Sequence, residues 1–173
     1  MIKVILGGLL LLLAACGCKK AVEPAAPARV AVPGLPTQAQ PRLQTVKLWL
    51  GAEELVTELA LNDIQRQTGM MFRTNMPENE GMLFVFPYPH QTGFWMMNTF
   101  VPLSAAYIDP EGVIVEIHDL EPRNTNTVMA ATDRIQYVLE TNRDWFKRHN
   151  VAVGSVIKTE RGTLPETFFR RRQ

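Results

Sequence analysis

Cysteine is scarce in this sequence, and neither of its two cysteines lies in the part that can fold. Cys16 and Cys18 stand at the end of an apolar N-terminal run, so the remaining chain has no disulfide framework and no thiol nucleophile. Serine is equally rare, because only Ser104 and Ser155 occur, and neither lies in a Gly-x-Ser-x-Gly elbow. No glycine-rich phosphate loop occurs either. These absences argue against a hydrolase that uses a serine or cysteine nucleophile.

An excess of charge of either sign is also missing. The chain has 18 Lys and Arg against 17 Asp and Glu, and cleavage of a leader containing Lys3 would balance the two. A nucleic-acid partner, which requires a basic face, is therefore not expected. The three consecutive arginines at 170–172 are interpreted as a solvated terminus, with weak contact to anionic lipid as the alternative.

The N-terminus has the features of an export signal. Lys3 precedes a short apolar run that ends in Leu-Ala-Ala-Cys, and the run is too short to span a membrane. This ending resembles the bacterial lipoprotein signal, in which the cysteine becomes the lipidated first residue. The resemblance implies lipidation of Cys16 and, because Gly17 is not an aspartate, an outer-membrane location facing the periplasm. The alternative is an ordinary cleavage site followed by an incidental cysteine.

These features divide the chain into four parts. Residues 1–15 are the expected signal peptide. Residues 16–42 are rich in alanine and proline and cannot bury enough surface to fold, so they are expected to form an extended tether. Residues 43–162 have the size of one ordinary domain. Residues 163–173 are expected to be a basic C-terminal tail.

Short strands dominate the predicted domain. Residues 44–50 and 55–59 alternate in hydropathy and predict a hairpin, and the turn signal at 109–112 predicts another between 105–108 and 113–117. Further strands are expected at 82–86, 92–97, 134–140 and 156–159. Two short helices are expected, one capped by Asn62 and one running from Asn142 to His149. The pattern predicts an α+β fold with a mostly antiparallel sheet or a small barrel.

Three blocks of sequence resemble a known family. They are Thr68–Arg73, Gly81–Phe86 and the segment 94–103, which reads Phe-Trp-Met-Met-Asn-Thr-Phe-Val-Pro-Leu. These blocks are similar to domain of unknown function 192 (DUF192), a bacterial and archaeal family whose members are often exported. The resemblance covers about residues 55–159. It implies a compact single domain of strands with short helices, and it implies no established activity.

Two positions depart from the family pattern. The family usually has Lys where this chain has Met97, and Asp where it has Ser104. If the family's Lys and Asp form a structural ion pair, replacing both is tolerable, whereas removing one would leave a buried charge without its partner. If they formed a catalytic pair, the chain has lost it and carries a degenerate site.

Polar residues interrupt an uncharged stretch at 93–108. Phe94 and Met96 are expected in the core, and their neighbours point the other way. One interpretation is a cleft able to hold a small polar ligand. Its candidate residues are Arg73, Trp95, Met97, Asn98, Thr99 and Ser104. The alternative is structural: Asn98 ties down a turn before Pro102, and Arg73 pairs with Glu78 or Glu80.

Methionine offers a second kind of site. Six of the eight methionines fall between residues 70 and 97, together with His90. Thioether sulfur is a soft ligand that selects Cu(I). The candidate ligands are Met70, Met76, Met97 and His90. The alternative is that flexible thioethers fill gaps in the core. Glu116 and His118, two apart on a strand, are interpreted as solvated strand residues.

Three functional hypotheses follow. The first is a lipid-anchored envelope protein whose domain binds a small ligand or another protein without catalysis. The second is a periplasmic copper binder that uses the surplus methionines. The third is an enzyme with a degenerate site. No residue stands out as catalytic, and no other cofactor is expected.

Overall fold

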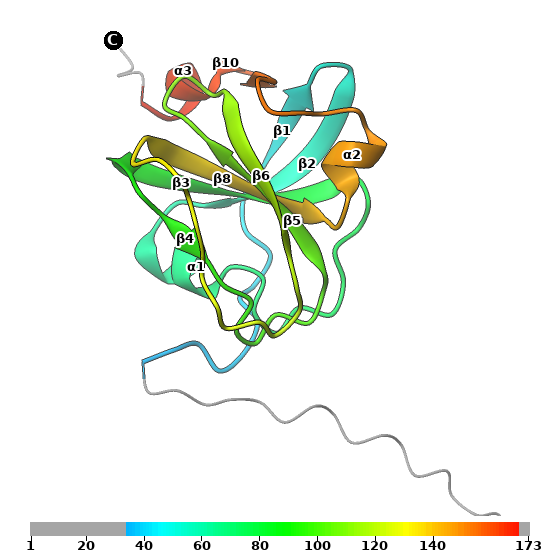
Figure 1. Cartoon of the computed structure of the whole chain (residues 1–173), viewed down its shortest axis with the longest axis vertical. Helices are drawn as coiled ribbons and strands as arrows, with labels where there is room; N and C mark the ends of the chain where they lie inside the picture. Colours follow the sequence, from blue (N-terminus) through cyan, green and yellow to red (C-terminus); the bar gives the residue numbers. More distant parts are fainter. Residues whose placement is uncertain (1–33, 170–173) are drawn as a thin grey trace, which may run out of the picture.

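The computed structural model describes residues 34–169 as a domain built mainly of strands (Figure 1). The expected signal peptide, the lipidation site Cys16 and the three arginines at 170–172 lie outside the described residues. The helices are α1 (Asp63–Thr68), α2 (Trp145–Arg148) and α3 (Leu164–Phe168). The strands are β1 (Thr45–Leu50), β2 (Glu53–Ala60), β3 (Glu80–His90), β4 (Gly93–Phe94), β5 (Leu103–Ile108), β6 (Ile114–Leu120), β7 (Val128–Met129), β8 (Ile135–Asn142), β9 (Ile157–Thr159) and β10 (Gly162–Thr163). None of these helices has the length and apolar character needed to cross a membrane.

Eight strands form one mixed sheet in the order β10-β9-β1-β2-β3-β8-β5-β6, and β4 pairs with β7 in a separate ribbon. Neighbouring strands are antiparallel except β2 and β3, which are parallel. The sheet curls until Val113 bridges Val156, but the bridge is isolated and the ladder does not continue there. The α+β class and the mostly antiparallel sheet are therefore confirmed. The barrel alternative is wrong, because the sheet does not close.

Local sequence signals explain several of these elements. Val46 and Leu48 are buried while their neighbours in β1 are more exposed, as the alternation predicts. Gly51 turns the chain into β2 with a φ of +68°, a value that favours glycine. Asn62 caps α1, because its side chain accepts a hydrogen bond from the Gln65 amide at 2.9 Å. Asp109 likewise anchors the turn between β5 and β6 by accepting from the Val113 amide at 2.8 Å.

The sheet buries apolar side chains on both faces. One face carries a core around Leu48, Leu83 and Leu139 that also receives Trp145 of α2. The other face carries a second core around Met82, Phe84, Tyr107 and Val138. Loop residues complete this second core, namely Met70, Met76, Met96 and Ala130. Because these loops and the end of α1 cover this second face, polar strand residues that point toward it are also removed from water.

The C-terminal part differs from the expected tail. Thr163 and Glu166 form a capping box that starts α3, and Leu164 is fully buried. Phe168 packs against the first core. The structure therefore has three helices where two were expected, and the folded part continues past residue 162.

Two other elements are shorter than predicted. The second helix begins at Trp145 and not at Asn142, because Asp144 adopts a left-handed φ of 60° just before it. The predicted strand at 92–97 is reduced to Gly93–Phe94, since Met97 and Asn98 turn the chain.

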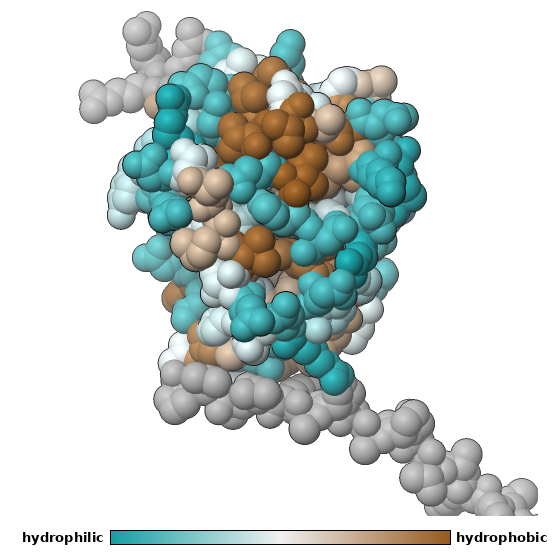
Figure 2. All heavy atoms as spheres, viewed as in Figure 1, coloured by the Kyte–Doolittle hydropathy of each residue, from teal (hydrophilic) through white to brown (hydrophobic). Residues whose placement is uncertain are grey.

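The surface of the described part carries few large apolar side chains. Figure 2 shows them gathered mainly toward the end of the molecule where α3 and β10 lie, with hydrophilic groups over much of the rest of this face. The most exposed are Ile64 of α1, Tyr88 of β3 and Val153 in the loop between α2 and β9. A cavity is consequently a better candidate site than an open apolar face.

Candidate functional site

Glu140 occupies an unusual position in the middle of the sheet. In β8 it pairs across to Met82 of β3 on one side and to Ala105 of β5 on the other. Directly paired residues point to the same face of a sheet, so Glu140 projects into the second core. The residue is only 4% exposed, and its Oε2 has no hydrogen-bond partner among the described residues. Burial raises the pKa of this carboxyl to about 8.

A cavity of about 280 Å³ lies beside this carboxyl. Its wall is built by the end of α1 with the loop that follows, by β3, by β4 and its flanks, and by the first described residues of the chain. The lining residues are Leu35, Arg66, Gln67, Thr68, Gly69, Met70, Met71, Phe84, Phe86, Thr92, Gly93, Phe94, Trp95, Thr99 and Glu140. A mostly apolar wall with a few polar groups is typical of a small-molecule site.

Aromatic rings form much of the wall. Phe84 and Phe94 meet edge to face, with ring centroids 4.8 Å apart and planes at 85°. Trp95 is 38% exposed and therefore reaches solvent as well as the cavity. Gly69 permits this packing, because a Cβ there would lie 3.2 Å from Cζ of Phe84 and the φ of +45° is strained for other residues. The rings and the glycine together keep the space beside Glu140 open.

Arg66 is the one lysine or arginine among the residues that line the cavity, and its donors are largely used within the fold. Its Nη1 donates to the carbonyls of Leu61 at 2.7 Å and Val85 at 2.8 Å. Its Nη2 donates to Asp63 Oδ1 at 2.6 Å. The guanidinium also lies over the ring of Phe86, 5.5 Å from its centroid. Arg66 is consequently part of the wall, with Asp63 as its counter-ion.

The chain enters the domain along this same wall. Leu35 lines the cavity, and the side chain of Gln40 donates to the carbonyls of Gln65 at 3.2 Å and Gly69 at 2.9 Å. Those carbonyls belong to the end of α1, where the Gln65 carbonyl also accepts from the Gly69 amide at 2.9 Å. The N-terminal segment is thus attached to the element that bounds the cavity.

The structure brings two of the predicted cleft residues to this cavity and places two others in the adjoining turn. Trp95 and Thr99 line the cavity. Asn98 has a φ of +56° in a turn closed by the Thr99 amide and the Met96 carbonyl at 3.0 Å, which is the structural alternative foreseen for it. Met97 is half-buried in the same turn and is not among the lining residues.

Arg73 and Ser104 are placed elsewhere. Arg73 forms a fork with Glu58 of β2, through Nη1 to Oε1 at 2.5 Å and Nη2 to Oε2 at 2.9 Å, and not with Glu78 or Glu80. Ser104 of β5 donates to Asp119 Oδ1 at 2.6 Å and accepts from the Asp144 amide at 2.9 Å. Both side chains tie parts of the fold together.

The candidate metal ligands are also dispersed. Met70 lines the cavity, whereas Met76 is packed in the second core. His90 ends β3 with its ring edge to face against Phe86, 4.7 Å between centroids. Within residues 34–169 no group of three or more His, Cys, Asp or Glu side chains is arranged to hold a metal ion.

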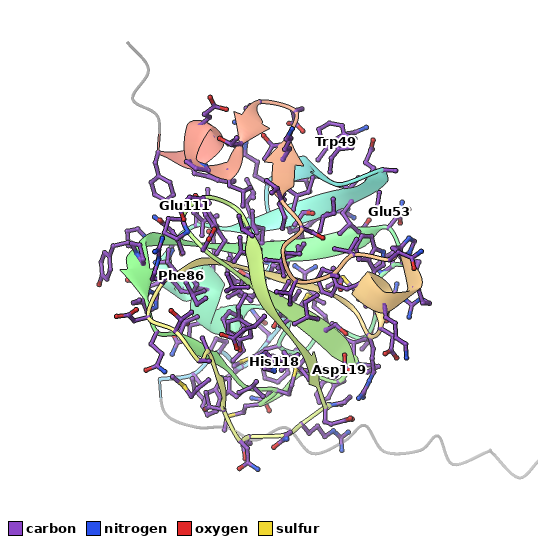
Figure 3. The ribbon with its side chains drawn as sticks, turned by 45° about the horizontal axis from the view of Figure 1, so that its top comes forward. Trp49, Glu53, Phe86, Glu111, His118 and Asp119 are labelled. Carbon is purple, nitrogen blue, oxygen red and sulfur yellow. The ribbon has the colours of Figure 1, made fainter. Side chains whose placement is uncertain are left out.

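A histidine and a glutamate on β6 form a pair of their own. His118 Nε2 lies 2.8 Å from Glu116 Oε2, and Glu116 Oε1 accepts from the Ala131 amide at 2.9 Å. Figure 3 shows His118 and Asp119 next to each other on this strand. The pair therefore fastens the loop before β8 to β6.

Sequence reasoning missed Glu140. The residues of β8 alternate, with Ile135, Tyr137 and Leu139 set against charged or polar neighbours, and this pattern gives no reason to single out Glu140. A signal was present in the neighbouring strands, because β3 and β5 read as continuous apolar runs and such strands are buried on both faces. A strand between them must also be covered on both faces, so its glutamate is buried.

Comparisons with known proteins agree with the sequence resemblance. The model of the DUF192 family, described as "Uncharacterized ACR", matches residues 46–159. A crystal structure of a Sinorhizobium meliloti 1021 protein, named as a candidate transcription regulator, is 30% identical with a TM-score of 0.66, covering 70% of this chain and 98% of that one. A protein of unknown function from Novosphingobium aromaticivorans DSM 12444 is 30% identical with a TM-score of 0.64, covering 82% of this chain and 99% of that one. No curated protein matches the sequence.

Proposed function

Because this chain belongs to the DUF192 family, which is uncharacterised, its function has to be argued from its own geometry, and we propose that it is a non-catalytic binding module for a small organic molecule. One observation carries the proposal: Glu140 is buried, has no partner for Oε2 in the described part of the chain, and is among the residues that line a cavity of about 280 Å³. The cavity is the place where a ligand would supply that partner.

Buried polar groups in folded proteins are nearly always hydrogen-bonded, and an unpaired one destabilises the fold. A glutamate in the second core of this domain therefore lowers the stability of the fold unless a group outside the chain forms a hydrogen bond or ion pair with it. A ligand with an apolar body and one polar group would fill the aromatic wall and satisfy the carboxyl together. Thr92 and Thr99, both buried at the cavity, offer two further hydroxyls.

The proposal includes a location in the cell. The apolar leader and the Leu-Ala-Ala-Cys ending support export and lipidation at Cys16, with the domain held at the outer membrane and facing the periplasm. A transcription regulator, as the Sinorhizobium protein is named, would need a basic face to bind nucleic acid, and the balanced charge of this chain does not favour one. Incorporation of labelled fatty acid into the wild-type chain and its loss in Cys16→Ser would support this location. Equal labelling of both would contradict it.

Binding can be tested on the full chain purified from membranes in mild detergent. Native mass spectrometry of the wild type should reveal a stoichiometric bound mass, and Glu140→Gln should lose most of it. Glu54→Gln, a substitution on the exposed side of β2, is the matched control and should keep the mass. The proposal fails if the wild type carries no small molecule and if a library of soluble fragments causes no NMR shift at Trp95 or Thr99.

Copper binding is a second candidate, because Met70 and Met71 line the same cavity. Elemental analysis of the purified chain should then give copper near one equivalent, lost on replacing both methionines by leucine. Met129→Leu, which changes an exposed methionine, is the control. Copper at background level after anaerobic loading with Cu(I) would rule this candidate out.

A further inference from the structure

We propose that the ligand of the cavity is a small organic ammonium ion whose charge is balanced by the Glu140 carboxylate. The inference rests on the proposed function, because it names the ligand class for the same cavity.

The first step is that Glu140 differs from the other charged groups around it. Paired residues in register place Glu58, Met82, Glu140, Ala105 and His118 in one row on the second face of the sheet. Glu58 is held by Arg73, and His118 by Glu116. Arg66 of α1, which also borders the cavity, is held by Asp63. Among these charged groups, Glu140 differs because its Oε2 has no hydrogen-bond partner in the described part of the chain.

The second step is the nature of the wall. Phe84, Phe86, Phe94 and Trp95 all line the cavity that Glu140 borders. Aromatic rings attract a cation within about 6 Å of their centroids, and the attraction grows when water is excluded. A carboxyl and four aromatic side chains together form a lining suited to binding an ammonium group with small alkyl substituents. A purely apolar ligand would leave the carboxyl unpaired, and an anion would be repelled once the carboxyl ionised.

The third step is the coupling to a proton. Burial raises the pKa of Glu140 to about 8, so the empty site is mainly protonated at pH 7. Tyr107 of β5 is an ionisable group on the same face, and its pKa is raised by burial and by Glu140, so it stays neutral. A bound ammonium ion stabilises the carboxylate, so the carboxyl proton is released to solvent as the ion pair forms. Binding is therefore expected to tighten as the pH rises toward the pKa of the carboxyl.

Calorimetric titration of the full chain with tetramethylammonium and choline tests these steps. Neither probe titrates, so any pH dependence belongs to the protein. We expect affinity to rise about tenfold between pH 6 and pH 7, because the protonated fraction of a carboxyl of pKa near 8 must be displaced. Titrations in two buffers of different ionisation enthalpy should give release of nearly one proton per ion at pH 7. The neutral analogue 3,3-dimethylbutan-1-ol, which has the shape of choline, should bind more weakly and release no proton.

Two variants identify the groups involved. Glu140→Gln should weaken choline at least tenfold and abolish the proton release, while leaving the neutral alcohol unchanged. Because Glu140 is buried, Trp95→Leu at the cavity mouth provides a second variant that should keep the fold, and it should weaken choline more than the alcohol. Trp49→Leu is its matched control, since Trp49 lines a different hollow and lies well away from Phe86 in Figure 3.

The failures can be told apart. If the neutral alcohol binds as tightly as choline, or if choline binding is independent of pH and of Glu140, the ammonium class is wrong and the binding module stands. If neither ammonium ion binds at millimolar concentration while neutral fragments shift Trp95 or Thr99, the same conclusion holds. If nothing binds in this cavity, both the ammonium class and the proposed function are overturned.

Discussion

Arg73 donates two hydrogen bonds to Glu58, from Nη1 to Oε1 at 2.5 Å and from Nη2 to Oε2 at 2.9 Å. The Leu43 amide donates a third, at 2.6 Å to Oε2. Burial alone would raise the pKa of Glu58, but these hydrogen bonds outweigh it and the pKa is lowered. Glu58 and Glu140 thus share one face of one sheet in opposite states, the first ionised and paired and the second neutral at pH 7 with Oε2 unpaired.

Arg73→Met should destabilise the domain by about 3 kcal/mol, because it leaves the Glu58 carboxylate buried without its cation. Urea denaturation followed by circular dichroism measures this. Adding Glu58→Leu should restore much of the loss, since both partners are then apolar. Arg134→Met is the control and should change little, because the pair between Arg134 and Glu111 is exposed. Equal losses from the two arginine variants would contradict the assignment.

The stability of the domain should fall as the pH rises above about 5, and Glu140 should be the cause. The unfolded chain releases this proton near the ordinary value of 4.5, whereas the folded chain keeps it to about 8. Between these values the folded state binds more protons, so each pH unit costs about 1.4 kcal/mol at most. Glu140→Gln should remove this slope. Denaturation curves at pH 5, 6, 7 and 8 for both proteins provide the comparison, and parallel pH profiles would show that Glu140 is not responsible.

Gly69→Ala should cost about 2 kcal/mol or more, because the new methyl group would press on Phe84 and the φ of +45° is strained for alanine. Gly154→Ala is a matched control: its φ is +91°, but a Cβ there meets nothing within 4 Å. The control should therefore lose only the backbone contribution, about 1 kcal/mol. Thermal melting gives both values. Similar losses for the two variants would mean that Phe84 moves aside freely.

Ser104→Asp should lower stability by about 2 kcal/mol, because the new carboxylate would be buried beside Asp119 and would no longer present a hydroxyl to both of its present partners. Asp119→Asn should recover part of the loss by removing the repulsion. The family pattern suggests a second rescue, by Met97→Lys, if Lys and Asp at these positions form an ion pair. Melting shifts of Met97→Lys and Ser104→Asp that simply add would refute that pairing.

The sequence predicted the elements that depend on neighbouring residues. Three such signals predicted their elements correctly, because each depends on residues a few positions apart. They are the alternation in β1, the Asn62 cap of α1 and the turn at Asp109. The parallel pairing of β2 with β3 was not foreseen, since it joins segments separated by α1 and a loop. Helix α3 was missed because five residues show no helical period, although the Thr163 and Glu166 spacing was a usable signal.

The candidate site was predicted only in part, and for a physical reason. Trp95 and Thr99 were proposed from an apolar stretch, and both line the cavity. Glu140 was not singled out, because strand alternation says which residues share a face, but not whether that face is covered. Coverage here comes from loops around Met70, Met96 and Ala130, which lie far from β8 in sequence or join it through irregular turns.

The attachment of Gln40 to the end of α1 has a mechanical consequence. Tension applied to the chain at residue 34 is resisted by hydrogen bonds to α1 and its end, from Gln67 to the Gly34 carbonyl at 3.5 Å and from Gln40 to the carbonyls of Gln65 and Gly69. Two further hydrogen bonds, from Arg42 to Glu80 at 2.7 Å and from the Leu43 amide to Glu58 at 2.6 Å, lie between Gln40 and β1. Gly69 and Leu35 both border the cavity, so a pull too weak to unfold the sheet would still deform the wall beside Glu140. Tension on the N-terminal segment and binding of a ligand in the cavity are therefore expected to affect each other.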